Sequence, residues 1–246
     1  KINQEPINYS IEICEGLLSN AFNLIHRDAV GSYIIIYDEA IDKSKIIQLL
    51  NSFPALNTPH VVPMNLSKQK KSFDGFNYIK SELIKYSCDK STALIAIGGG
   101  SIGDLVGFIA STFYRGINYI QIPSTLLSMI DSSIGGKTAI DTKDGKNLIG
   151  SYHHPNIVLL DPRMLNGIAK AEINSGLFEA IKYGLALDSD LFKSLSNNLD
   201  DLKEMVSLTP LIERCCQLKV NIIQEDERDS SERQKLNFGH TIGHAI

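Results

Sequence analysis

The sequence has no apolar run that reaches the roughly 18 residues of a membrane-spanning helix, which argues against a transmembrane segment. It also has no extended basic segment. The formal net charge is −4, and the short cationic cluster at residues 68–71 is typical of a solvated surface. We therefore expect no nucleic-acid or membrane partner. No apolar core follows the first residues, so we expect no signal peptide.

Cysteine is scarce, and its spacing fits neither a zinc site nor a disulfide framework. The four residues are Cys14, Cys88, Cys215 and Cys216, without a C-x-x-C pair or zinc-ribbon spacing. The adjacent Cys215 and Cys216 lie in an expected helix, where their side chains diverge. The sequence therefore predicts buried, reduced thiols and a cytoplasmic location.

The 246 residues are 43% hydrophobic and 21% charged, as in a globular protein with ample core. Their sequence patterns divide the chain into two parts. Up to about residue 165, continuous apolar runs at residues 32–37, 92–97 and 119–122 predict buried strands. Helical spacing covers residues 41–51, and residues 53–63 read as a loop before a short strand. Buried strands separated by helices indicate a parallel α/β sheet.

After about residue 170 the strand signals vanish. Residues 171–187, 190–199 and 209–227 all carry helical periodicity. We predict an α/β fold with a nucleotide-type domain at residues 1–168, followed at residues 169–246 by the opening part of an α-helical domain.

A glycine-rich segment, residues 98–104 (GGGSIGD), follows a buried strand and opens an apolar helix. Glycines in this context let the backbone approach a phosphate, and the helix N-terminus supplies free N–H groups. The pattern is not the G-x-G-x-x-G dinucleotide fingerprint, and a tight turn is the alternative. We favour phosphate or dinucleotide binding.

Two further segments, residues 130–138 and 144–150, combine small polar residues with an acid and a lysine. Solvated turns would explain one such segment. Two of them after a candidate dinucleotide loop, with Arg115 nearby in sequence, indicate a pocket for a phosphorylated or carboxylated substrate.

Acid–base and metal-ligand candidates lie in the helical part. Glu179 and Lys182 are three apart on one helix, where a surface ion pair is the usual interpretation. Their apolar neighbours favour a position in a cleft instead. His240 and His244 share a helix face, and with Glu179 they would form a His₂Glu metal site. His26, His60 and the His153-His154-Pro155 turn receive no role.

The longest motifs occur in order from about residue 31 to the end, at residues 98–107, 115–116, 123–127, 131–137, 145–150, 179–182 and 237–244. Together they resemble the 3-dehydroquinate synthase family. That family converts a sugar-acid phosphate (DAHP) to 3-dehydroquinate and phosphate in the shikimate pathway, which leads to aromatic amino acids. It uses NAD, which oxidises one alcohol transiently and is regenerated, and a divalent metal, zinc by preference or cobalt. The resemblance implies a carbon–oxygen lyase that acts as a homodimer.

The resemblance also implies a role for each matching residue. The NAD-binding residues would be Asp38, Lys71, Gly99, Gly100, Ser101, Asp104, Ser124, Thr125 and Lys146. The substrate-binding residues would be Arg115, Asp131, Lys137, Asn147, Lys182, Lys219, Arg233 and Asn237. Arg115 would reach across a dimer interface. Glu179 and His240 would bind the metal, and His244, Lys182 and Lys137 would be catalytic, with His244 as a proton shuttle rather than a ligand.

The chain departs from the family pattern at a few points. Lys68 stands where relatives carry an acid beside the adenosine, and residues 166–169 (NGIA) replace a turn with a hydroxyl near the cofactor. The third metal ligand of relatives belongs to a His-Gly-Glu segment that the resemblance places beyond residue 246, so we expect a truncated helical domain. The alternatives are a related cyclase, such as an inosose synthase, a glycerol-dehydrogenase-like enzyme, and a catalytically incomplete NAD-binding fragment. A carboxylate-bearing substrate best explains Lys219, Arg233 and Asn237.

Overall fold

The structure, a computed structural model, describes residues 9–26, 30–203, 208–229 and 232–237. Its strands are β1 Ser10–Ile13, β2 Ser32–Asp38, β3 His60–Met64, β4 Thr92–Gly98, β5 Asn118–Pro123, β6 Lys137–Ile140, β7 Ile149–Tyr152 and β8 Ile157–Leu160. Its α-helices are α1 Ala21–Ile25, α2 Lys43–Leu50, α3 Phe73–Lys85, α4 Gly100–Thr112, α5 Lys170–Leu187, α6 Ser189–Lys203 and α7 Thr209–Glu225. None of the described helices is both long and apolar enough to cross a membrane.

By internal packing the chain divides into two compact units, Lys1–Pro123 with Gly136–Asp161 and Ser124–Gly135 with Pro162–Ile246. We call them the first and the second unit. The predicted domain boundary after residue 168 stays a prediction.

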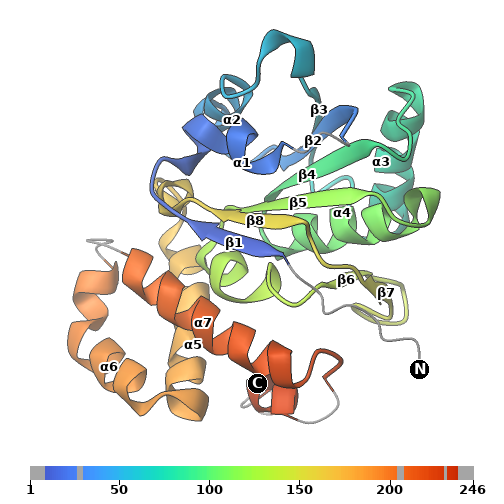
Figure 1. The fold of residues 1–246 in the computed structure, drawn as a ribbon. Coiled ribbons are helices and arrows are strands. Elements are labelled where there is room, and N and C mark those ends of the chain that lie inside the picture. The colour runs from blue at the N-terminus through green and yellow to red at the C-terminus, as the bar shows by residue number, and fades with distance from the viewer. Residues whose placement is uncertain (1–8, 27–29, 204–207, 230–231, 238–246) are drawn as a thin grey trace, which may run out of the picture. The chain divides into compact units, whose positions relative to one another are not determined.

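The first unit contains a six-stranded parallel sheet in the order β1-β8-β5-β4-β2-β3, and a separate antiparallel hairpin of β6 and β7 (Figure 1). Every residue of β4 is buried, as expected for a strand covered on both faces. The strands predicted at residues 32–37, 92–97 and 119–122 are therefore confirmed as β2, β4 and β5. The sequence interpretation did not identify β1, β8, α3 or the hairpin.

Alternate side chains of the central strands pack on opposite faces of the sheet. Ile34 and Leu94 belong to a core cluster with α3 and α4, in which Leu105 and Val106 are fully buried. On the other face Tyr33 contacts aromatic rings of α1 and of the segment after α2. In Figure 1, α4 accordingly lies on a different side of the sheet from α1 and α2.

The second unit contains α5, α6 and α7, a π-helical turn, η4, at Ser128–Ser132, and two 3₁₀ segments, η5 at Pro162–Leu165 and η6 at Glu232–Asn237. The three helices predicted after residue 170 are thus confirmed. Asp188 caps α6 by accepting from the amides of Asp190 and Leu191, each at 3.1 Å, and it also pairs with Arg214 of α7. This carboxylate ties the α5–α6 turn to the third helix.

Two details of the sequence interpretation need correction. Cys88, Cys215 and Cys216 are buried free thiols as expected, but Cys14 is exposed, because it directly follows the short edge strand β1. His26, for which we found no partner, lies 3.1 Å from the Tyr33 hydroxyl, and His60 stacks on Tyr86. Both contacts join residues whose proximity depends on the fold.

Candidate functional site

The glycine-rich segment forms a strand–turn–helix at the carboxyl edge of the sheet. β4 ends at Gly98, and Gly99 is the N-cap of α4, with no side chain to cap the first turn. Tyr37 pairs with Ile97, so Asp38, at the end of the neighbouring strand β2, reaches the same edge. Ligands of open parallel sheets bind outside this edge, and helix N-termini there attract anions. The predicted residues Gly99, Gly100, Ser101 and Asp104 all belong to this turn and the first turns of α4.

Lys71 joins three polar segments of the first unit. Its Nζ donates to Asp104 Oδ2 at 2.9 Å and also to Asn147 Oδ1, and it lies 3.7 Å from Asp141. The Lys71 side chain is only 12% exposed, whereas Asn147 is exposed to solvent. Asp141 Oδ1 in turn accepts from the Asn147 amide at 3.0 Å, which fixes Asn147 in a left-handed conformation (φ 57°). Lys71 therefore positions two other residues predicted to bind ligands.

A cavity of about 360 Å³ opens beside this group. It brings together Asp104, Lys137 and Asn147, with a rim from β6, β7 and the connecting loop. Gly107 makes this arrangement possible: a Cβ there would lie 2.5 Å from Thr138 Cγ2, so only glycine lets α4 pass so close to β6. An ammonium and an amide beside a carboxylate can bind a phosphorylated polyol.

Two predicted residues stand apart from this cavity. Arg115 is exposed, follows Tyr114 in a turn where both have positive φ (65° and 49°), and is not among the residues lining the cavity. Lys146 is exposed in the loop before Asn147. Their roles stay predictions.

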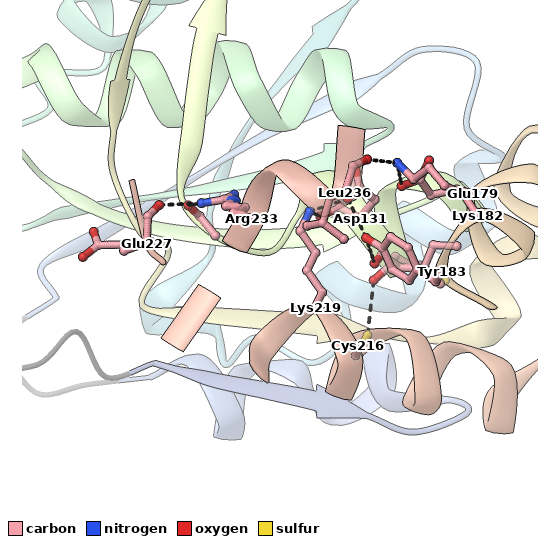
Figure 2. Close-up of polar contacts among 12 residues, drawn as sticks. Asp131, Glu179, Lys182, Tyr183, Cys216, Lys219, Glu227, Arg233 and Leu236 are labelled. Atoms are coloured by element: carbon pink, nitrogen blue, oxygen red, sulfur yellow. Dashed lines mark hydrogen bonds and ion pairs between the residues drawn. The ribbon is translucent and has the colours of Figure 1, made fainter. Parts of the chain in front are cut away.

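In the second unit, Asp131 is the half-buried centre of a cluster of largely buried polar side chains (Figure 2). It lies in the π-helical turn η4, a conformation often found at functional sites. Lys219 of α7 donates to both the main-chain oxygen and Oδ1 of Asp131, each at 2.5 Å. The Tyr183 hydroxyl of α5 donates to the same Oδ1 at 2.7 Å.

These contacts set the ionisation of the cluster. Burial alone would raise the pKa of Asp131, but the Lys219 charge and the hydrogen bonds from Lys219 and Tyr183 together lower the pKa to about 2. Burial lowers the pKa of Lys219, and the Asp131 carboxylate opposes that shift. Burial, followed by the Asp131 charge, raises the pKa of Tyr183 far above its ordinary value. Asp131 is thus ionised at neutral pH, and Tyr183 acts only as a donor to it.

Glu179 and Lys182 form the second charged pair of this unit. Glu179 Oε1 lies 2.5 Å from Lys182 Nζ as an ion pair, and among the described residues this buried oxygen has no other polar partner. Both side chains are nearly buried, at 13% and 12% exposed, so the pair is not an ordinary surface pair. Burial and then the charge of Asp131 raise the pKa of Glu179. The ammonium groups of Lys182 and Lys219 oppose these effects in part, and a metal cation bound to the carboxylate would oppose them further, so Glu179 fits a metal ligand.

Arg233 is the third buried cation, at 4% exposed. Its guanidinium donates to the carbonyl oxygens of Glu227 at 2.6 Å and of Gly135 at 3.5 Å. Gly135 has a φ of 101°, and a Cβ there would lie 2.8 Å from Ile223 Cδ1, so this position requires glycine. The Arg233 guanidinium therefore contacts the chain at Gly135, shortly after the turn η4 that carries Asp131.

The remaining predicted residues are only partly described. Thr125 Oγ1 hydrogen-bonds with Ser128 Oγ at 2.8 Å, and Ser124 is buried. His240 and His244 lie outside the described residues, as does the side chain of Asn237. Within the described residues no three His, Cys, Asp or Glu side chains form a group that could hold a metal ion.

Sequence reasoning missed two residues that hold predicted site residues in place, Asp141 and Tyr183. Asp141 lies between the two polar segments that we singled out, and Tyr183 directly follows Lys182. Their nearness to predicted residues was visible in the sequence, but their hydrogen-bond partners were not.

Comparison with known proteins places this arrangement in a family. The descriptions "3-dehydroquinate synthase N-terminal" and "3-dehydroquinate synthase C-terminal" match residues 61–175 and 176–246. The 3-dehydroquinate synthase of Haemophilus ducreyi is 40% identical over 242 residues, covering 97% of this chain and 67% of that protein. The chain belongs to the 3-dehydroquinate synthase family.

Solved structures of related enzymes share the fold. ValA, a 2-epi-5-epi-valiolone synthase from Streptomyces hygroscopicus solved with NAD⁺ and Zn²⁺, superposes with a TM-score of 0.87 at 26% identity, over 98% of this chain and 68% of that one. A 2-deoxy-scyllo-inosose synthase with carbaglucose-6-phosphate, NAD⁺ and Co²⁺ gives 0.81 at 27% identity, over 96% and 65%. The chain spans 53% of the length of the 3-dehydroquinate synthase of Clostridium perfringens and 69% of that of Pseudoalteromonas translucida.

Proposed function

We propose that this chain carries the chemistry of 3-dehydroquinate synthase and converts DAHP to 3-dehydroquinate and phosphate as an NAD- and metal-dependent lyase. The observation that carries the proposal is the buried polar cluster of the second unit. Three cations, Lys182, Lys219 and Arg233, accompany an ionised Asp131 there. Burying so much charge is costly, which favours a role for it in binding, and this set suits a ligand with a carboxylate and several hydroxyls.

The first unit has groups suited to binding a phosphate ester and a dinucleotide. Lys137 and Asn147, at the cavity of about 360 Å³, would hold the substrate phosphate. Arg115, exposed on its turn, would contact the substrate of a second protomer in a homodimer. The N-terminus of α4 would bind the pyrophosphate of NAD, with Asp38 and the Lys71–Asp104 pair beside it.

The chemistry of the groups present fits both cofactors. The glycine N-cap of α4 leaves room for a phosphate at the carboxyl edge, and Glu179 offers a buried carboxylate oxygen beside Lys182. His240 would be a further metal ligand. NAD when bound supplies a hydride acceptor, and a divalent metal supplies polarisation of substrate oxygens.

The remaining roles belong to side chains of the chain. Asp131 would accept from a substrate hydroxyl while Lys219 and Arg233 hold the carboxylate. Lys182, paired with Glu179, would orient a hydroxyl near the metal, and His244 would carry a proton to or from the substrate. With these roles, we expect the chain to act in the cytoplasm, in the biosynthesis of aromatic amino acids.

The test is phosphate release from DAHP by the 246-residue chain. The assay is run with NAD and zinc, then without NAD, and then with a chelator. Release that requires both additions would support the proposal. No release, with NAD still bound, would mean that the chain is an NAD-binding fragment whose catalysis needs additional residues of a longer protein.

A further inference from the structure

We infer that Tyr183 is a positioning residue that holds the Asp131 carboxylate in one orientation, with its second oxygen open to the substrate. The inference deepens the proposed function and rests on it, because it takes Asp131 as the group that accepts from a substrate hydroxyl. It assigns a role to a tyrosine that is not itself a ligand-binding candidate.

The two carboxylate oxygens of Asp131 have different surroundings. Oδ1 accepts from both Lys219 Nζ, at 2.5 Å, and the Tyr183 hydroxyl, at 2.7 Å. No described group donates to Oδ2, and the Asp131 side chain is 31% exposed, so a ligand can reach it. Two donors on one oxygen and none on the other fix the rotation of the carboxylate and leave Oδ2 open to a ligand.

Tyr183 is suited to hold this rotation because its own position is fixed. Its ring is fully buried, and the hydroxyl carries a single proton with two acceptors in reach. Asp131 Oδ1, at 2.7 Å, is far closer than the Ile130 carbonyl oxygen, at 3.4 Å. Lys219 alone would not suffice, because its flexible ammonium also bonds the main-chain oxygen of Asp131 and could follow the carboxylate as it rotates.

The experiment measures DAHP binding by calorimetry to the 246-residue chain loaded with zinc and NADH, because the reduced cofactor cannot oxidise DAHP and the ligand is bound without being converted. Tyr183→Phe removes the hydroxyl and keeps the ring, and it should weaken DAHP binding about tenfold, the effect of losing one well-placed charge-assisted hydrogen bond. The matched control is Tyr33→Phe, because Tyr33 is equally buried and its hydroxyl meets His26, which has no site role. The control should bind DAHP as the wild type does.

Two further variants separate positioning from general damage. In an Asp131→Ala background, Tyr183→Phe should cost no additional affinity, since the residue acts through Asp131. Tyr183→4-aminophenylalanine, which restores an N–H donor on the same ring, should recover most of the lost affinity. If the phenylalanine variant fails to fold, the amino variant is compared directly with the wild type, and a loss of DAHP affinity of about tenfold or more in it would overturn the inference.

The outcomes distinguish the inference from the function it rests on. Wild-type binding of DAHP with no loss in Tyr183→Phe would overturn the inference and leave the proposed function standing. The inference would also be overturned if Tyr183→Phe weakened DAHP binding as much in the Asp131→Ala background as in the wild type. Failure of 4-aminophenylalanine to restore DAHP affinity would overturn it as well. A wild-type chain that does not bind DAHP would overturn both.

Discussion

Lys219 Nζ lies 2.5 Å from both the main-chain oxygen and the carboxylate Oδ1 of Asp131. One buried ammonium, 5% exposed, therefore fixes a turn and neutralises an acid at the same time. Removing either partner leaves the other charge buried without compensation, which is more costly than the net value of the pair. The first prediction follows from this contact.

Asp131→Asn should destabilise the chain by about 3 kcal/mol at pH 7, because the Lys219 ammonium loses its counter-charge. The pKa of Asp131 in the folded chain, about 2, is below the ordinary 3.8. Its stabilisation is therefore present above pH 4 and is lost as the pH falls through 2. Urea unfolding of both proteins at pH 7, 4 and 2 should show the difference shrinking by about 2 kcal/mol between pH 4 and 2. A constant difference would argue against the ion pair.

Lys137→Ala should weaken DAHP binding about tenfold and leave NAD affinity nearly unchanged, because a phosphate loses its counter-charge in the cavity. Calorimetry with each ligand measures both effects. Lys143→Ala is the control, since Lys143 is exposed in the following loop and does not line the cavity. A selective loss of NAD affinity would refute the assignment of Lys137 to the phosphate.

Lys71→Met should loosen the loop of residues 141–148, because Asp104, Asn147 and Asp141 lose their common cation. We expect about 1–2 kcal/mol less protection against hydrogen exchange there, even without NAD. Mass spectrometry of peptides from this loop provides the measurement. Lys70→Met changes an exposed neighbour and should leave the exchange as in the wild type. Equal exchange in both variants would show that Lys71 does not organise the loop.

Glu179→Gln should abolish tight zinc binding, because an amide oxygen replaces the anionic ligand. Elemental analysis after dialysis measures the zinc content. The control is Glu172→Gln, an exposed acid in the first turn of the same helix, which should retain the metal. Full zinc content in the Glu179 variant would remove this residue from the ligand set.

His244→Ala should keep the metal and slow phosphate release by about 10²-fold or more, as expected when a proton carrier is lost. Zinc content and the rate of phosphate release are measured on the same preparation. A variant that no longer holds zinc would instead make His244 a ligand, as the spacing of His240 and His244 alone suggested.

Local patterns in the sequence were enough to predict β2, β4, β5 and the three helices of the second unit. Continuous apolar runs and helical periodicity report the burial of each segment without knowledge of its neighbours. The glycine-rich turn before α4 was predictable for the same reason, because a strand, a tight turn and a helix follow one another in the chain. β1 and β8 were missed: each has four residues, and Ser10 pairs with Ile157 across most of the first unit.

The sequence by itself determined the family, the parallel sheet followed by helices, and the residue types available for chemistry. The tertiary structure alone decided which of them meet: Lys71 with Asp104 and Asn147, and Asp131 with Lys219 and Tyr183. The partners in these contacts lie between 33 and 88 positions apart. Side chains so far apart in the sequence come together only when the core packs, and no local periodicity records that pairing.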